Sequence, residues 1–241
     1  MSAKRTVKTI REQVYRILRD EICQGVYPAG YWLQEAELTE HLQVSRSPVR
    51  EAMRQLVSDG LLIEIPNKGV FVKKFTIKDI EEIYDLRVLL ESYAIYHSAG
   101  HMTTSRTEKL LSLLEAFETT YKTGDREAYT AVDEDLHTSI VRFTDNSLVN
   151  DIYERVHSMN QQFRVMSLMD ERRFRESLDE HRAIIHALVT GDVHTADAID
   201  RHHLMLACEA IRKQLENQKE PEKEAAAQVP AKTPENGAAE R

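Results

Sequence analysis

The chain has 241 residues, and 41% of them are hydrophobic, which is enough for more than one packed core. Its net charge of −8 is uneven, because residues 1–74 carry 12 Lys and Arg against 9 Asp and Glu, a net +3, and the remainder carries −11. No run of about 18 apolar residues and no apolar N-terminal segment occurs, which excludes a membrane span and a secretory signal. We therefore expect a cytoplasmic protein with no membrane partner, in which Cys23 and Cys208 are core thiols.

The first predicted domain, residues 1–74, contains two helices separated by a tight turn. One helix starts at about Glu35, and a short break at 43–45 precedes the second helix. Ser45 is expected to cap the second helix by accepting a backbone hydrogen bond, and Pro48 suits its first turn. Apolar residues recur there at helical spacing: Val49, Ala52, Met53, Leu56 and Val57. This order predicts a helix-turn-helix.

Arginines follow one edge of the second helix, beside its apolar stripe. Arg46, Arg50 and Arg54 are four residues apart, so their guanidinium groups could pair with phosphates or guanine edges in a major groove. Two arginines alone at this spacing usually mark a solvated helix edge. Here a predicted hairpin follows, with strands at 61–65 and 70–72 around a turn at 66–69, and the whole pattern favours a winged DNA-binding domain.

Residues 9–73 resemble the winged helix-turn-helix domain of the GntR family of bacterial transcription regulators. Four segments carry the resemblance: 13–22, 25–30, 33–38 and 44–52. The resemblance implies that Arg46, Ser47 and Arg50 contact operator DNA and that Gly69, at the wing tip, approaches the minor groove. Some relatives also use an arginine at the position of Ala36, so that contact is absent from this chain.

The second predicted domain, residues 75–218, follows a short linker at 73–76 and is entirely helical. Gly, Asn and Asp separate its segments, with breaks at Gly100, 123–124, 145–147 and 191–192. Six helices are expected, at about 77–100, 105–122, 125–144, 147–168, 171–190 and 194–216. Residues 219–241 are rich in Glu, Lys, Ala and Pro and are predicted to form a disordered tail. The predicted fold class is mainly α, a winged helix-turn-helix followed by a helical bundle.

Four polar residues on three of these helices are expected to point into the bundle. Asp133 and His137 are one helical turn apart, while His181 and His203 each share a stripe with aliphatic residues. A buried, unpaired carboxylate is costly, and a divalent cation would neutralise it while using the imidazole lone pairs. The alternative is a set of hydrogen-bonded core histidines, which is the commoner state of a single inward histidine.

A second resemblance concerns these residues. The segments 133–137, 177–192 and 198–204 resemble the signature segments of the FCD ligand-binding domain, which defines the FadR subfamily of GntR regulators. The resemblance implies a divalent metal, commonly zinc, held by Asp133, His137, His181 and His203. These ligand types also admit nickel or manganese. It further implies a homodimer.

Arg87 lies between Ile83 and Leu90 on a mostly apolar helical stripe. From the pattern alone, it is most simply an exposed ion pair with Glu91, four residues later. The FCD resemblance instead implies that Arg87 clamps the carboxylate of an effector, a small organic or sugar acid coordinated to the metal. Tyr84, one turn earlier, could line that pocket or belong to the core.

Taken together, these features predict a ligand-responsive bacterial transcription regulator, generally a repressor, that binds double-stranded operator DNA as a homodimer. A metal-dependent enzyme is one alternative, but the chain has no Gly-x-Ser-x-Gly or His-Glu-x-x-His motif. Glu134 and Asp135 are the only evident general bases, and their helical positions differ from those of the ligands. The other alternative is a DNA-binding protein that has no effector.

Overall fold

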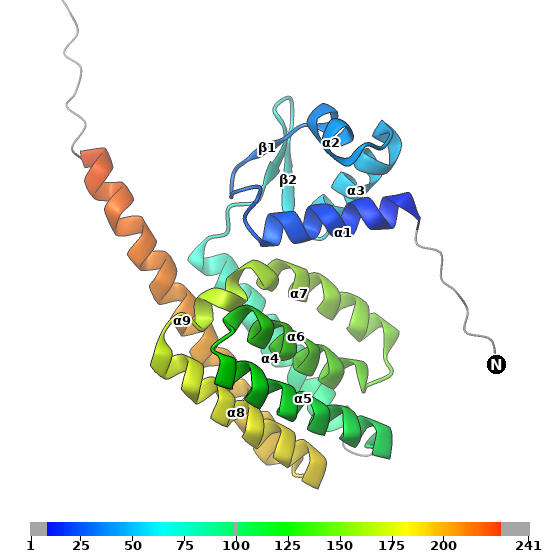
Figure 1. The fold of residues 1–241 in the computed structure, drawn as a ribbon, viewed down its shortest axis with the longest axis vertical. Helices are drawn as coiled ribbons and strands as arrows, with labels where there is room; N and C mark the ends of the chain where they lie inside the picture. Colours follow the sequence, from blue (N-terminus) through cyan, green and yellow to red (C-terminus); the bar gives the residue numbers. More distant parts are fainter. Residues whose placement is uncertain (1–8, 99–100, 228–241) are drawn as a thin grey trace, which may run out of the picture.

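The computed structural model describes residues 9–98 and 101–227, which form a small winged domain and a helical domain (Figure 1). The winged domain contains helices and strands in the following order: α1 (Ile10–Cys23), β1 (Trp32–Leu33), α2 (Glu35–Leu42), α3 (Arg46–Ser58), β2 (Leu62–Ile65) and β3 (Gly69–Val72). Its antiparallel sheet has the strand order β1-β3-β2. The predicted helix-turn-helix and hairpin are confirmed, while β1 is too short for its alternation to be visible in the sequence.

The winged domain is built around one apolar core. α1 begins with a reciprocal cap in which Thr9 and Glu12 each accept a hydrogen bond from the other's backbone amide. Its buried face packs with the buried face of α3 and with Leu38 of α2. The prediction for Ser45 is wrong in one respect. Ser45 is the N-cap of α3, but its side chain makes no capping hydrogen bond. The residue is exposed, so water can satisfy the free amide groups.

The helical domain contains the six predicted helices, with ends close to those expected except at the end of the last one. They are α4 (Ile77–Ser98), α5 (Thr104–Thr123), α6 (Arg126–Arg142), α7 (Ser147–Ser167), α8 (Glu171–Thr190) and α9 (Val193–Ala227). α5 and α8 end at Gly124 and Gly191, which adopt the left-handed conformation that glycine favours. The predicted break at Gly100 lies outside the described residues.

α9 is longer than predicted. The last predicted helix was expected to end at about residue 216, but α9 continues to Ala227, into the segment for which a disordered tail was predicted, and residues 228–241 lie outside the described part of the chain. The composition argument considered only whether this segment could bury apolar surface. Glu, Lys and Ala have high intrinsic helix propensity, which can extend a helix that is already nucleated by packing upstream.

The helices of the second domain pack around α4 and α9. α9 contacts α4, α7 and α8, and α5 contacts α6 and α8. One apolar cluster includes Phe117, Tyr129 and Leu136, and another includes Phe163 and Leu204. None of the described helices is long and apolar enough to cross a membrane.

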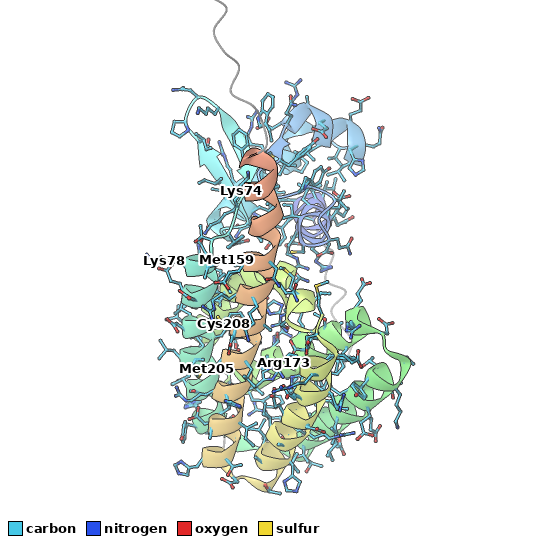
Figure 2. The ribbon with its side chains drawn as sticks, turned by 90° about the vertical axis from the view of Figure 1, so that its left-hand side faces the viewer. Lys74, Lys78, Met159, Arg173, Met205 and Cys208 are labelled. Atoms are coloured by element: carbon cyan, nitrogen blue, oxygen red, sulfur yellow. The ribbon has the colours of Figure 1, made fainter. Side chains whose placement is uncertain are left out.

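The two domains meet where α1 lies next to α7 (Figure 1). Arg155 of α7 donates hydrogen bonds to the backbone oxygen of Ser58 at 2.5 Å and to its hydroxyl at 3.3 Å. The Cys23 thiol donates to Gln161, so Cys23 is a half-buried junction residue and not the core thiol that was predicted. Cys208 is also half-buried. Met159, labelled in Figure 2, lies against Gly60 at the same junction.

Candidate functional site

Four side chains from α6, α8 and α9 converge inside the helical domain. The Oδ1 atom of Asp133 lies 3.4 Å from Nε2 of His137 and 3.0 Å from Nε2 of His181. The same oxygen lies 3.8 Å from Nε2 of His203. One candidate ligand atom from each residue lies within 4.8 Å of the others. The structure thus brings together the four residues that the sequence analysis selected.

The separations suit a metal ion. Two ligands at zinc-ligand distances and a tetrahedral angle are about 3.4 Å apart, which is close to the distances from Asp133 Oδ1 to the three imidazoles. The Nε2 atoms of His137 and His181 are buried, and although Asp133 Oδ1 lies 3.4 and 3.0 Å away, neither nitrogen forms a hydrogen bond of good geometry among the described residues. Because buried polar atoms are normally satisfied, two orphaned nitrogens that face a carboxylate fit a cation between them.

The opposite ring nitrogen of each histidine is held by a neighbouring side chain. His137 Nδ1 lies 2.5 Å from Glu91 Oε2, and His203 Nδ1 lies 2.7 Å from Glu180 Oε2. His181 Nδ1 lies 2.9 Å from the hydroxyl of Tyr129. Such partners fix the ring orientation and direct Nε2 toward a common point. The sequence analysis missed these three roles because each partner acts on a histidine from a different helix.

The four residues of the cluster differ in their protonation states. Burial alone would raise the pKa of Asp133, but Arg164 and His137 hold it well below its ordinary value, so Asp133 is a carboxylate. Burial lowers the pKa of His181 and, with its histidine neighbours, that of His203 well below normal, so both rings are neutral. For His137, Glu91 and Asp133 outweigh burial and raise the pKa to about 9. A metal ion would have to displace that proton.

A further carboxyl group lies behind His137. Asp200 is fully buried, and its Oδ1 atom is 3.5 Å from His137 Nδ1. Burial and the nearby Glu91 raise its pKa to about 7. The sequence analysis did not select Asp200. Its only sequence signal is its position three residues before His203 on the same helix.

Arg87 and Tyr84 lie beside the cluster. Arg87 is only 2% exposed, and its Nε donates to Glu91 Oε1 at 2.9 Å, so the pair with Glu91 forms but is buried and not exposed. The Arg87 guanidinium is 5.1 Å from the ring centre of Tyr84. Both residues, with Asp133 and His203, line an enclosed cavity of about 10 Å³. That volume holds about one water molecule, so a larger ligand requires the cavity to open.

Two more arginines line this cavity. Arg164 of α7 contacts Oδ2 of Asp133, and Arg173 of α8 donates to Glu180 Oε2 at 2.8 Å. Both are buried. The sequence analysis missed them because arginines on amphipathic helices usually lie on a solvated face, and their spacing carried no contrary signal.

The proposed DNA-contacting side chains of α3 are exposed. Arg46, Ser47 and Arg50 all face solvent. Arg50 forms a bidentate ion pair with Glu35 of α2, and both N–O distances are 2.8 Å. This partner was not predicted, and it holds the guanidinium in one orientation. The Ser47 hydroxyl donates to Glu51. Ala36, where some relatives have arginine, is exposed on α2.

Gly69 begins β3 at the wing tip. Its φ of +109° disfavours other residues, and a Cβ there would lie 2.5 Å from Nε1 of Trp32. The positive φ therefore favours glycine at this position, and Trp32, a neighbour that the sequence analysis did not identify, would have to shift to admit a side chain. Trp32 itself is half exposed.

Comparisons with known proteins agree with both domains. Residues 10–72 match the family described as "Bacterial regulatory proteins, gntR family", and residues 82–206 match the FCD domain. The chain belongs to the GntR family and carries an FCD domain. Regulators of this family bind operator DNA, and FCD domains bind small-molecule effectors.

Similar proteins are regulators and not enzymes, which excludes the metal-dependent enzyme. The uncharacterised regulator YdhC of Bacillus subtilis is 29% identical over 86% of this chain and 93% of its own length. The gluconate operon transcriptional repressor of the same species is 30% identical over 73% of this chain and 74% of its own length. The structure of E. coli McbR/YncC matches with a TM-score of 0.76 and 21% identity, over 87% of this chain and 100% of that one, which shows the shared fold.

Proposed function

We propose that this GntR-family regulator is a metal-containing repressor that binds a palindromic operator as a homodimer and releases it when a small acid binds in the helical domain. The observation that carries the proposal is the set of three imidazole Nε2 atoms facing Asp133 Oδ1, beside a cavity lined by arginines. In this proposal the protein acts in the bacterial cytoplasm, where operator DNA lies.

Zinc is the proposed metal. Three imidazoles and one carboxylate form a donor set that zinc accepts, and nickel or manganese would also accept it. A bound ion would supply a Lewis-acid centre that coordinates a carboxylate oxygen. The chain's own contribution is orientation, because Glu91 and Glu180 fix two of the imidazoles and Arg164 holds the second oxygen of Asp133.

The proposed effector is a small organic acid or a sugar acid. Arg87 is buried at the cavity, and its Nη2 atom has no hydrogen-bond partner among the described residues. A buried guanidinium with free N–H groups favours an anion, and a carboxylate matches its planar geometry. The name of one relative links that protein to the gluconate operon, and gluconate belongs to this class of acids.

An exposed apolar stripe on α4 supports the homodimer. Four large apolar residues recur there at helical spacing and are 43–63% exposed: Leu86, Leu89, Tyr93 and Tyr96. Leu148 and Ile152 of α7, which packs against α4, are also exposed. Contiguous apolar surface on a protein of this size marks an interaction site. A twofold axis through this stripe would pack it against the same stripe of a second protomer.

α7 is the proposed link between the two sites. Arg164 on α7 contacts Asp133 at the cluster, while Arg155 on the same helix contacts Ser58 of the winged domain. An effector that binds one position of α7 more tightly than another would shift the winged domains and so lower operator affinity. We place this coupling in α7 because the helix contacts both sites directly.

The experiment is a DNA-binding titration of the zinc-loaded protein. An operator duplex, selected from a random pool by the protein itself, is titrated in the absence and presence of a panel of small acids. At least one acid should weaken binding by about tenfold or more, as typical coupling energies imply. Operator affinity should also fall steeply with salt, because phosphate contacts release counterions. Binding that no acid alters, or that salt does not weaken, would contradict the proposal.

A further inference from the structure

Three buried arginines from three different helices surround the cavity beside the histidine cluster. Arg87 comes from α4, Arg164 from α7 and Arg173 from α8. Each is paired with one carboxylate, and those carboxylates belong to Glu91, Asp133 and Glu180. Three guanidinium groups in one small buried space are costly unless their charges and their N–H donors are all compensated.

The three ion pairs leave several N–H donors of the arginines without an acceptor. Nη2 of Arg87, Nε of Arg164, and both Nε and Nη1 of Arg173 are buried without a hydrogen-bond partner among the described residues. An unsatisfied buried N–H group is costly, and it is more costly on a charged side chain. These donors therefore indicate a ligand with several acceptor oxygens.

The charge balance shows that the metal-loaded site needs an anion. The three ion pairs cancel, since three guanidinium groups face three carboxylates. A divalent cation among neutral imidazoles would then add two positive charges, of which the fully buried Asp200, 3.5 Å from His137 Nδ1, can offset at most one. A single carboxylate with one oxygen on the metal leaves only one oxygen for donors that come from three helices.

Resting on the proposed function, we propose that the effector carries two acidic groups, and that Arg164 and Arg173 select the second one. The ligand class is a small dicarboxylate, including sugar acids oxidised at both ends. With one oxygen on the metal, a dianion still offers three carboxylate oxygens to the free donors, whereas a single carboxylate offers one.

A route for such a ligand leads past Arg173. A surface groove of about 550 Å³ between the start of α8 and α9 shares Ser167 and Arg173 with the cavity. Arg173, labelled in Figure 2, lies where α8 runs beside α9. Because the cavity is nearly closed, opening it toward the groove requires Arg173 to move from Glu180, and rebinding of the guanidinium to the ligand would close it.

The test is calorimetric titration of the zinc-loaded full chain with matched acids. Succinate is compared with butyrate, and glucarate with gluconate, so that within each pair the number of carbons is constant and only the second carboxylate differs. At least one dianion should bind at least about tenfold more tightly than its partner, as expected for one charge-assisted bond. Equal affinities in both pairs would overturn the inference.

Two variants test whether Arg173 is the residue that confers the preference for the dianion. Arg173→Gln should reduce the preference for the dianion to less than about threefold while the zinc content, measured in parallel, is retained. Arg175→Gln is the matched control, because Arg175 is exposed on the same helix and is not one of the residues that line the groove. An undiminished preference in Arg173→Gln would also overturn the inference. If Arg173→Gln fails to fold, the comparison within the two pairs of acids on the native chain still tests whether the effector is a dianion.

The outcomes separate this inference from the proposed function. A protein that binds zinc and both members of a pair equally supports a carboxylate effector but not a dianion. A protein that binds zinc but none of the four acids, or that binds no zinc, contradicts the proposed effector site itself.

Discussion

Glu91 is the residue at which the histidine cluster and the arginine cavity meet. Its Oε1 accepts hydrogen bonds from Arg87 at 2.9 Å and from Tyr153 at 3.1 Å, and its Oε2 faces Nδ1 of His137. Arg87 and His137 outweigh the effect of burial and lower the pKa of Glu91 to about 2. A single fully buried carboxylate thus orients both a candidate metal ligand and a candidate effector clamp. The sequence showed only its i,i+4 spacing from Arg87.

Replacing Glu91 should therefore weaken metal binding without removing a ligand. In Glu91→Gln the side-chain shape is kept, but the charge that orients His137 is lost. We expect zinc affinity, measured by competition with a chelator, to fall by about 10- to 100-fold, as for other partners of metal ligands. Glu82→Gln, at an exposed site on the same helix, should leave it unchanged. Unaltered zinc affinity in Glu91→Gln would show that the carboxylate does not support the site.

At the scale of elements, the positions of the helices could be predicted from the sequence, but the contacts between helices could not. Periodic apolar residues and helix-ending glycines located α4 to α9, and the turn residues located the wing. The pattern of one helix states which side chains share a face, but not which face of another helix they meet. Asp133 and His137 were paired by spacing, whereas Arg164 and Arg173 were missed because nothing local distinguishes them from solvated arginines. Trp32 was missed as a partner of Gly69 for the same reason.

The start of α4 provides a test of local stability. The carboxylate of Asp79 accepts hydrogen bonds from the Thr76 backbone amide at 2.8 Å and hydroxyl at 2.6 Å, and pairs with Lys73 at 2.8 Å. Although burial opposes it, Lys73 and Thr76 lower the pKa of Asp79 to about 2. Asp79→Asn should reduce the free energy of unfolding by about 1 kcal/mol at neutral pH, as loss of a helix cap does.

This stabilisation should depend on pH in a defined direction. Because the folded-state pKa lies below the ordinary value of 3.8, the contribution is complete above that value and is lost as the pH falls toward 2. The difference in melting temperature between the native chain and Asp79→Asn should therefore narrow as the pH falls from about 4 to about 2. Glu81→Gln, exposed on the same helix, serves as the control. A difference that widens on acidification would contradict the assignment.

At the scale of the whole molecule, the proposed switch requires α7 to move the winged domain. Arg155 donates to Ser58 across the junction, and a groove of about 490 Å³ lies between the domains at this point. The junction is thus polar and incompletely filled. Such interfaces allow relative motion of domains more readily than apolar ones.

Removing the Arg155 contact should uncouple the two sites. In Arg155→Ala, we expect the acid to bind with little change, while its effect on operator affinity falls by about threefold or more, within the usual range of coupling energies. Calorimetry and the DNA titration measure the two quantities separately. Arg142→Ala, which removes an exposed ion pair with Glu154 of α7, is the matched control. An effector response equal to that of the native chain would place the coupling elsewhere.

The dimer is a second property of the whole molecule. Leu89 is 63% exposed in the α4 stripe, and Leu111 is 45% exposed on α5. Leu89→Glu places a charge in the proposed interface and should shift the sedimenting species from dimer to monomer, because an unpaired buried charge is costly. Leu111→Glu should not. A dimer that persists in Leu89→Glu would exclude this face as the interface.

The most direct test of the whole account is the melting temperature of the full chain with and without small acids, measured both after loading with zinc and after chelation. A ligand that binds the folded state raises the melting temperature by mass action. We predict that at least one acid stabilises the zinc-loaded protein but not the chelated protein, and that Arg87→Ala abolishes this effect. If chelation changes nothing and no acid acts, the four-residue site is not a metal centre and the regulator is not controlled through it.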